Sequence, residues 1–235
     1  MPDFENRTNG LEIMDDLDVS GGDLHQALHE LESINYLLGG NYVTLNGLAQ
    51  LLEKKEWANE IYIADLGCGS GDILKLMRRL LEKRKISAVL TGIDANPNVV
   101  KYAIANTPAV CRIHYEELDI FSDEFRNRKF DIVTGTLFFH HFTSPQLTAF
   151  FNQLKEQVST GIIINDIHRH WFSYYSIKWL TKFFSRSPMV KHDAPMSVLR
   201  AFKRKDLAEI LQKAGILTYR IKWCWAFRWQ VIVRF

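Results

Sequence analysis

Short apolar runs alternate with amphipathic segments through the middle of the chain. The run "IYIADL" at 61–66 has the length and composition of a strand, and "DILKLMRRLLEKR" at 72–84 repeats apolar residues every three or four positions, as an amphipathic helix does. Continuous apolar strands separated by helices indicate a parallel sheet covered on both faces. The same alternation predicts strands at 88–94, 111–119, 130–137 and 160–167, with helices at 98–106 and 145–158.

The C-terminal end of the chain follows a different pattern. A helix at 203–216 closes at Gly215, and glycine commonly ends helices. Two strand-like runs follow at 217–225 and 228–235, and the two residues between them are too few for a parallel crossover. These runs must therefore pair antiparallel, which predicts an α/β fold with a seven-stranded, doubly wound sheet and a C-terminal antiparallel hairpin.

Two further segments lie outside the alternation. Residues 23–56 show two helical patterns separated by a pair of glycines, and residues 171–200 form an unusually aromatic segment after the fifth strand. An insertion at that point lies beyond the carboxyl edge of the sheet, where open α/β sheets bind ligands. We therefore predict a single domain over 1–235, with an N-terminal helical cap at 1–56 and a helical, lid-like insertion at 171–200.

Composition and charge narrow the function classes. With 235 residues, 47% hydrophobic and 24% charged, the chain is ordinary for a globular protein, and its formal net charge of +2 provides no field that favours nucleic acid. Three cysteines without a CxxC pair indicate neither a disulfide framework nor a zinc site. The first ten residues show no secretory signal, and the span 132–154 is too polar for stable membrane insertion. We expect a cytoplasmic protein.

The turn "DLGCGSG" at 65–71 is the most informative stretch of the sequence. It joins a strand to a helix, and its glycines permit both a tight turn and the close approach of a ligand to backbone N–H groups. The dinucleotide fingerprint GxGxxG would place a third glycine at position 72, where this chain has Asp72. An NAD-dependent oxidoreductase is therefore disfavoured, and a tight turn without a ligand is the alternative to a binding site.

An acid two residues before the first glycine, with GxGxG spacing, resembles motif I of the class I S-adenosylmethionine-dependent methyltransferases. The resemblance implies a Rossmann-like fold, methyltransferase activity and S-adenosyl-L-methionine as the cofactor. It also implies that the loop wraps the methionine and ribose end of this cation, which an acidic loop suits better than a pyrophosphate. The candidate cofactor-binding residues in the loop are Asp65, Gly67, Cys68, Gly69 and Gly71.

Acids at the next two strand ends extend the candidate site. Asp94 lies 29 positions after Asp65, where it can accept hydrogen bonds from both ribose hydroxyls, with Ala95 beside it; its alternative role is to cap the following helix. The resemblance implies that Asp119 accepts from the adenine amino group and that Ile120 lies against the ring. For Asp119, the alternative is a solvated loop acid.

The end of the fourth strand resembles motif IV of the same enzymes. In this family the backbone there passes the methionine group, which adds Thr134 and Gly135 to the candidate cofactor-binding residues. A nucleic-acid amino-methyltransferase would show a [DNS]PP[FYW]-type signature at this point, and "TGTLF" does not. We therefore predict a small-molecule acceptor and no nucleic-acid partner.

Histidines near the strand ends are candidate bases. A phenolic acceptor with a pKa of about 10 reacts more readily when a base that is active near neutral pH takes its proton, and histidine meets that requirement. His140 and His141 follow the fourth strand, and we favour His141 because many small-molecule members that the chain resembles have a histidine there. Packing or helix capping is the alternative for it. His168, after the fifth strand, is the third candidate catalytic residue.

Two other groups around the insertion carry possible chemistry. Asp166 and His168 share one face of an extended segment and could ligate a divalent metal, but no clear third ligand accompanies them, so we predict no metal site. His192 and Asp193 form either a site pair or a surface ion pair.

The aromatic residues of the insertion bear on the size of the acceptor. We expect one face of the insertion to cover the pocket, which implies a flat or lipophilic acceptor, with Lys178 and Lys182 on the wet face; simple packing on the sheet and a surface that skims a membrane are the alternatives. These aromatic residues are Trp171, Phe172, Tyr174, Tyr175, Trp179, Phe183 and Phe184.

Several segments resemble a narrower, bacterial subgroup of small-molecule methyltransferases, often encoded near type III polyketide synthases and flavin-dependent oxidoreductases. They include "INDIHRH", "SRSPMVKHDAPMSVLRAF" and "KAGI", and the likeness covers nearly the whole chain. The resemblance implies O-methylation of a phenolic, quinol or polyketide-derived ring. Cys68 and Ser70 depart from the loop that is common in that subgroup. C- or N-methylation, and a protein that binds the cofactor without transferring a methyl group, are the alternative functions.

Overall fold

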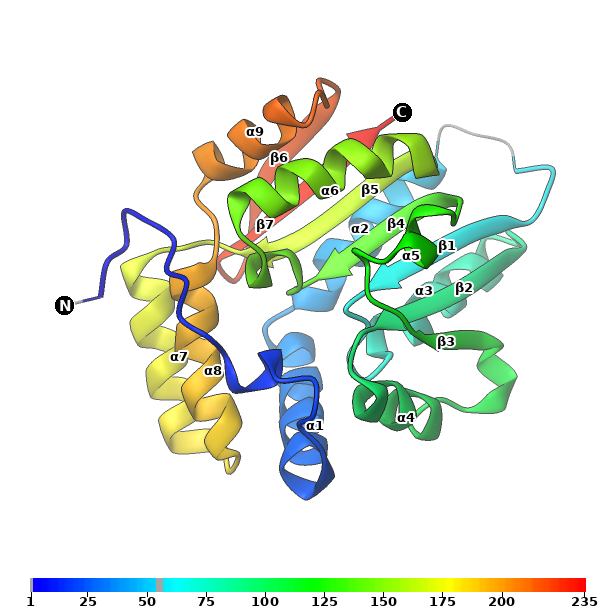
Figure 1. The fold of residues 1–235 in the computed structure, drawn as a ribbon. Coiled ribbons are helices and arrows are strands. Elements are labelled where there is room, and N and C mark those ends of the chain that lie inside the picture. Colours follow the sequence, from blue (N-terminus) through cyan, green and yellow to red (C-terminus); the bar gives the residue numbers. More distant parts are fainter. Residues whose placement is uncertain (1, 54–56) are drawn as a thin grey trace.

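A central sheet organises the structure, a computed structural model in which residues 2–53 and 57–235 are described. Over these residues the sheet has seven strands in the order β3-β2-β1-β4-β5-β7-β6 (Figure 1). The first five pair in parallel, and β7 is antiparallel to both of its neighbours. The strands are β1 (Ile61–Leu66), β2 (Ala88–Asp94), β3 (Ile113–Glu117), β4 (Phe130–Thr136), β5 (Val158–Ile167), β6 (Tyr219–Cys224) and β7 (Arg228–Arg234).

The predicted seven-stranded, doubly wound, Rossmann-like sheet with a C-terminal antiparallel hairpin is confirmed. The strand predicted at 111–119 is shortened to Ile113–Glu117. Residues 109–111 form a 3₁₀ turn, η2 (Ala109–Cys111), and Arg112 follows with a left-handed φ of 49°, so β3 begins only at Ile113. Strand patterning alone cannot detect such a turn, because its residues are apolar like those of the strand.

Helices cover both faces of the sheet (Figure 1). On one face, Leu48 and Met77 pack with Ile63 of β1. On the other face, Phe150 and Leu207 pack in a separate cluster with the alternate residues of the strands, whose side chains point to that side of the sheet. Apolar residues on both sides of each central strand explain the continuous apolar runs in the sequence. The helices are α2 (Gly40–Leu52) and α3 (Asp72–Lys83) on the first face, and α5 (Asp123–Arg126), α6 (Ser144–Gln157) and α9 (Arg204–Lys213) on the second.

The remaining helices gather beyond the carboxyl ends of the parallel strands. Leu28 of α1 packs on Val99 of α4, and Ala27 packs on Val190 of α8, so α1 bridges two sides of this edge. The helical insertion predicted after β5 is confirmed as α7 and α8. Residues 1 and 54–56 of the predicted cap lie outside the described residues. These elements are η1 (Ile13–Asp15), α1 (Gly21–Leu37), α4 (Pro97–Ala105), η3 (Phe139–His141), α7 (Trp171–Phe184) and α8 (Pro188–Arg200).

Candidate functional site

The glycine turn between β1 and α3 has a backbone that only glycine adopts readily. Gly67, Gly69 and Gly71 have φ values of 62°, 51° and 73°, in the left-handed region. A Cβ on Gly67 would lie 2.1 Å from a ring carbon of Phe138, whereas a Cβ on Gly69 would meet nothing within 4 Å. Two of the three glycines therefore let the turn pack closely, and Gly69 presents its bare backbone to open space.

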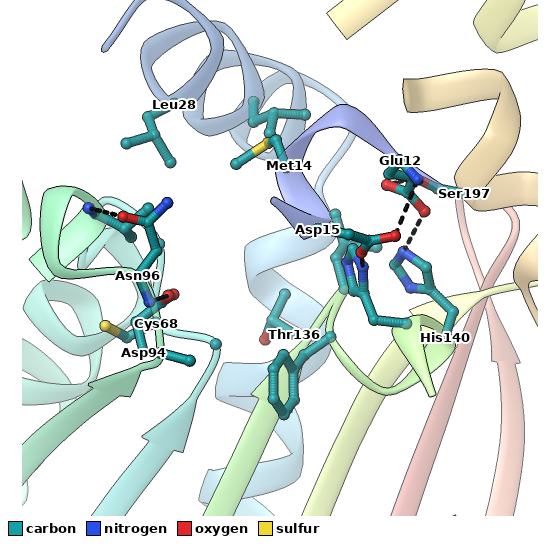
Figure 2. Close-up of a pocket in the computed structure, with 18 of the residues that line it drawn as sticks. Glu12, Met14, Asp15, Leu28, Cys68, Asp94, Asn96, Thr136, His140 and Ser197 are labelled. Carbon is teal, nitrogen blue, oxygen red and sulfur yellow. Dashed lines mark hydrogen bonds and ion pairs between the residues drawn. The ribbon is translucent and has the colours of Figure 1, made fainter. Parts of the chain in front are cut away.

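That open space is a cavity of about 510 Å³ at the carboxyl edge of the sheet (Figure 2). It lies between the strand ends on one side and η1, α1 and α8 on the other. The predicted site residues that line it are Asp65, Gly67, Cys68, Gly69, Asp94, Ala95, Asp119, Ile120, His140 and His141. The structure thus brings together residues from the ends of four strands, as expected when parallel strands end at one edge.

Three carboxyl groups cluster at the glycine-turn end of the cavity. Burial, opposed by a hydrogen bond from the Thr134 hydroxyl (2.5 Å), raises the pKa of Asp65 to about 8, and the charges of Asp72 and Asp94 raise it further. Burial also raises the pKa values of Asp72 and Asp94. Among the described residues, no Lys or Arg forms a salt bridge with any of the three. A concentration of acids without paired bases suits a positively charged ligand.

Asp94 keeps its side chain available to a ligand. The cap of α4 is Asn96, whose side-chain oxygen accepts hydrogen bonds from the N–H groups of Asn98 (2.8 Å) and Val99 (3.4 Å). The Asp94 carboxyl accepts hydrogen bonds from loop N–H groups, that of Asn96 at 3.0 Å and those of Gly69 and Ala95. The helix-capping alternative for Asp94 is therefore wrong, and its carboxyl faces the cavity (Figure 2).

Three predicted cofactor residues do not line the cavity. Thr134 is fully buried and donates to Asp65, and a Cβ on Gly135 would lie 2.5 Å from the Phe139 ring. The sheet continues to Thr136, so the wall is formed by the residues that follow these two, at 136–138. Gly71 turns toward Tyr115 and away from the cavity. Thr134 and Gly71 thus act on the site indirectly, by holding Asp65 and the turn.

The opposite end of the cavity carries a histidine and carboxylate pair. His141 Nδ1 lies 2.6 Å from Asp15 Oδ1, and Arg200 contacts both the other Asp15 oxygen and the carbonyl oxygen of His141. Although burial raises the pKa of Asp15, hydrogen bonds from His141, the Glu12 N–H and Arg200 hold it well below its usual range. An ionised Asp15 can accept a hydrogen bond from Nδ1–H of His141, and in a neutral imidazole this tautomer has Nε2 as a hydrogen-bond acceptor.

His140 has a different environment from its neighbour. Its Nδ1 lies 2.7 Å from Asp166 Oδ1, and its Nε2 lies 3.5 Å from Glu12 Oε1. Burial lowers the pKa of His140, but Asp166 and Glu12 outweigh this and raise it to about 9. His140 is therefore an imidazolium near neutral pH and has no lone pair for a general base, so its prediction as a catalytic base is not supported. It neutralises two buried carboxylates in the cavity wall.

His168 does not line the cavity, so the structure gives no support to its prediction as a catalytic residue. Its ring packs edge-on against Trp229 at 4.8 Å, and burial with nearby positive charges lowers its pKa to about 4. Asp166 turns instead to His140, so these two residues do not share a metal site. Glu12, His140 and His141 do place ligand atoms within 4.8 Å of one another, but Arg200 already lies 3.5 Å from the same Glu12 oxygen.

Sequence reasoning missed the residues that the N-terminal segment contributes and Arg200 of α8, although it singled out Asp193. Glu12, Asp15 and Arg200 line the cavity, and Asp193 accepts hydrogen bonds from the N–H groups of Ile13 (2.8 Å) and Met14 (3.1 Å). Asp193 thereby holds η1 over the cavity, whereas its neighbour His192 is exposed. The only signal was the first eighteen residues, which hold six acids and one base.

The insertion borders the cavity through α8 and not through the aromatic α7. The side chains of α8 line it, among them Val190, Ala194 and Ser197, while no residue of α7 does. The aromatic residues of α7 point outward, and Trp179 is 61% exposed. The aromatic side chains of α7 therefore do not form the predicted cover of the pocket, because α7 packs on the outer side of α8.

The close packing around Gly71 leads us to expect that a substitution there lowers the stability of the protein. Gly71→Ala should lower the free energy of unfolding by about 3 kcal/mol, because a Cβ there meets a left-handed φ and would lie 2.0 Å from the Tyr115 hydroxyl oxygen. Gly69→Ala is the matched control: it has the same backbone penalty without a clash and should cost about 1 kcal/mol. Urea unfolding without ligand measures both. Equal losses would contradict the close packing of the turn.

Comparisons with known proteins point to one activity. Residues 63–161 match the model of a family described as a methyltransferase domain. A comparison with curated proteins finds no match. Among the described residues, no helix is long and apolar enough to cross a membrane.

Solved structures with the same fold include several methyltransferases. The plantazolicin methyltransferase BpumL in complex with SAH is 22% identical, with a TM-score of 0.59 over 86% of this chain and 78% of that one. Human N-acetylserotonin methyltransferase with SAM is 16% identical (TM-score 0.63, 90% and 55%). Magnesium protoporphyrin IX methyltransferase from Synechocystis PCC 6803 with bound SAM is 15% identical (TM-score 0.54, 86% and 82%). Residues 63–161 of this chain thus match a methyltransferase-domain family, and the chain shares its fold with these methyltransferases.

Proposed function

We propose that this enzyme methylates a hydroxyl group of a small aromatic or lipophilic acceptor, a phenol or quinol. The observation that carries the proposal is the His141–Asp15 pair, which faces the same cavity as the acidic glycine turn. Asp15 holds His141 in the tautomer whose Nε2 can accept a proton from a hydroxyl. A phenol with a pKa of about 10 needs such a base near neutral pH, whereas an amine that is already deprotonated does not.

The glycine-turn end of the cavity fits the cofactor. Asp94 would accept hydrogen bonds from the ribose hydroxyls, Asp119 would accept from the adenine amino group, and Ile120 would lie against the ring. Asp65 and the backbone of Gly67 and Gly69 would hold the methionine end. When bound, the cofactor supplies a reactive methyl group on a positively charged sulfur. Alignment of the acceptor with that methyl group is the main task left to the protein.

Apolar side chains from the N-terminal segment favour a lipophilic acceptor. Leu11, Met14, Leu17, Leu28 and Leu31 line the cavity together with the polar groups described above. Apolar walls with a few convergent polar groups are typical of sites for small organic ligands. The names of N-acetylserotonin methyltransferase and magnesium protoporphyrin IX methyltransferase, which share this fold, are consistent with such an acceptor. A polyketide-derived ring, as the bacterial subgroup suggests, is a member of this class.

The proposal is tested by incubating the enzyme with methyl-labelled S-adenosylmethionine and a panel of phenols, quinols and matched aryl amines. We expect label in phenols or quinols and an O-methyl resonance in the product by NMR. Label on a ring carbon would support the alternative of a quinone C-methyltransferase, because the same base could remove the ring proton after transfer. Tight cofactor binding with no label in any acceptor of these classes would contradict the proposal.

Cofactor binding should release a proton at pH 7. Since the pKa of Asp65 is about 8 in the free site, this carboxyl holds a proton at neutral pH, and a positive charge beside it favours ionisation. Affinity should therefore rise as the pH increases from 6 toward 8. Calorimetry in buffers of different ionisation enthalpy counts the protons. Asp65→Asn should abolish the release, and the same release from this variant would exclude Asp65 as its source.

A further inference from the structure

The outer side of α7 and the tip of the β6–β7 hairpin expose an unusual number of aromatic rings. Phe184 is 81% exposed, Trp225 69%, Phe183 63% and Trp179 61%. Most rings of this size are buried in a soluble domain, and a cluster of exposed ones marks an interaction site. We call this surface the aromatic face; it consists of Trp171, Phe172, Tyr175, Trp179, Phe183, Phe184, Trp223 and Trp225.

The two parts of the aromatic face form one surface. The Phe227 ring, in the hairpin turn, lies 5.6 Å from the Phe172 ring of α7. The same ring lies 6.2 Å from Trp223 and 6.4 Å from Trp225. Figure 1 shows α7 (yellow) at the outside of the molecule, away from the sheet. Segments that are distant in sequence thus build one continuous, outward-facing patch.

The two segments that form the aromatic face carry bases and no acids, while one acid from elsewhere, Glu30 of α1, accepts hydrogen bonds from Ser185 and Arg186 at the end of α7. The sequence has no Asp or Glu from Ile167 to His192, and none after Glu209. The bases in these segments include Lys178, Lys182, Arg186, Lys191 and Lys222, all exposed. The Lys178 ammonium lies 5.6 Å from the Tyr174 ring centroid, and the Lys182 ammonium 5.9 Å from that of Phe183. Lysines therefore stand among the rings, and no acid of the described residues pairs with Lys178 or Lys182 in a salt bridge.

We propose that the aromatic face docks this enzyme on an anionic membrane surface. Trp, Tyr and Phe prefer the headgroup region, where part of the ring is apolar and part is wet, and lysines among them reach anionic headgroups. With 14 residues, α7 is too short to span a bilayer, so it lies in the plane of the interface.

Charge favours an anionic membrane over a second copy of the chain as the partner of the aromatic face. Two aromatic faces brought together would place lysines opposite lysines, and neither segment carries an acid to pair with them. Like charges in contact oppose association. An anionic lipid surface supplies the missing negative charge. The inference does not depend on which acceptor is methylated. It gives the two helices of the insertion different roles: α7 contacts the bilayer, and α8 contributes residues to the cavity.

The test is sedimentation of the full chain with vesicles of phosphatidylcholine alone or mixed with phosphatidylglycerol. We expect binding to the anionic vesicles, at least 10-fold weaker binding to the neutral ones, and weakening at high salt. Trp179→Ser/Phe183→Ser and Lys178→Glu/Lys182→Glu should each weaken anionic binding about 10-fold or more. Tyr62→Ser/Val110→Ser is the matched control, because these residues are 51% and 80% exposed but lie elsewhere.

Cofactor binding by calorimetry shows that each variant is folded, since no substituted residue lines the cavity. Failure of the unaltered chain to sediment with anionic vesicles would overturn the proposal. So would full binding by both face variants, because the attachment would then use another surface. A dimer in analytical ultracentrifugation that Trp179→Ser/Phe183→Ser dissociates, with no vesicle binding, would assign the face to self-association instead.

Discussion

Asp94→Ala is expected to weaken S-adenosylmethionine binding about 100-fold. The carboxyl of Asp94 ends β2 at the cavity and would accept hydrogen bonds from two ribose hydroxyls, and hydrogen bonds to a charged group contribute about 1.5–3 kcal/mol each. Removal of one acid also relieves repulsion among Asp65, Asp72 and Asp94, which offsets part of the loss. Isothermal titration calorimetry with S-adenosylmethionine and S-adenosylhomocysteine measures the change, and both ligands should weaken, since both carry the ribose.

Two variants test the ribose assignment of Asp94. Asp94→Asn keeps one acceptor oxygen and should recover part of the affinity. Asp123→Ala removes an exposed carboxylate from the first turn of α5 and should leave binding unchanged. If Asp94→Ala binds both ligands as tightly as the unaltered enzyme, the acid does not hold the ribose, and Asp119 becomes the next candidate.

His141→Ala should lower kcat by roughly 10²–10⁴-fold while leaving the cofactor dissociation constant within about twofold. The fall in kcat is expected because the variant lacks the Nε2 atom that would take the proton from the substrate hydroxyl. Cofactor affinity should hold because the acids at the glycine turn are unchanged. The fall in kcat should shrink for phenols whose hydroxyl is already ionised at the assay pH, since those acceptors need no base. Turnover measured across phenols of graded pKa separates a base from a residue that only positions the acceptor.

His168→Ala is the matched control for His141. It removes a half-buried histidine outside the cavity and should keep kcat close to that of the unaltered enzyme. Asp15→Asn should lower kcat with a smaller change in KM, because an amide does not stabilise the imidazolium that forms on His141. Unchanged turnover in His141→Ala with every phenol would remove this residue as the base.

The order and type of the elements could be predicted because they depend on local pattern. The spacing of apolar residues predicts the alternation of β1 with α3 and of β4 with α6. The two-residue connection between the predicted runs of β6 and β7 allows only antiparallel pairing. The 3₁₀ turn at 109–111 escaped because its departure from extended backbone is set by the left-handed Arg112. The periodicity of apolar residues in the sequence does not predict such a turn.

The cofactor end of the site could be predicted for a topological reason. Parallel strands end at one edge, so acids that follow β1, β2 and β3 in the sequence meet in space, and Asp65, Asp94 and Asp119 all line the cavity. Thr134 and Gly135 do not line the cavity, because β4 continues for another residue before the chain reaches it. The residue at which a strand ends depends on its pairing with the neighbouring strands, so local sequence could not place the end of β4.

By itself, then, the sequence determined the sheet, the glycine turn and the acids at its edge, since each follows from local spacing and strand direction. Only the tertiary structure showed which partners each histidine has, on which the proposed base depends. Asp15 reaches His141 from 126 positions away, and Arg200 joins them from the end of α8. Charge state and exposure depend on such distant neighbours: two acids make His140 a cation, and packing on α8 turns the aromatic side chains of α7 outward.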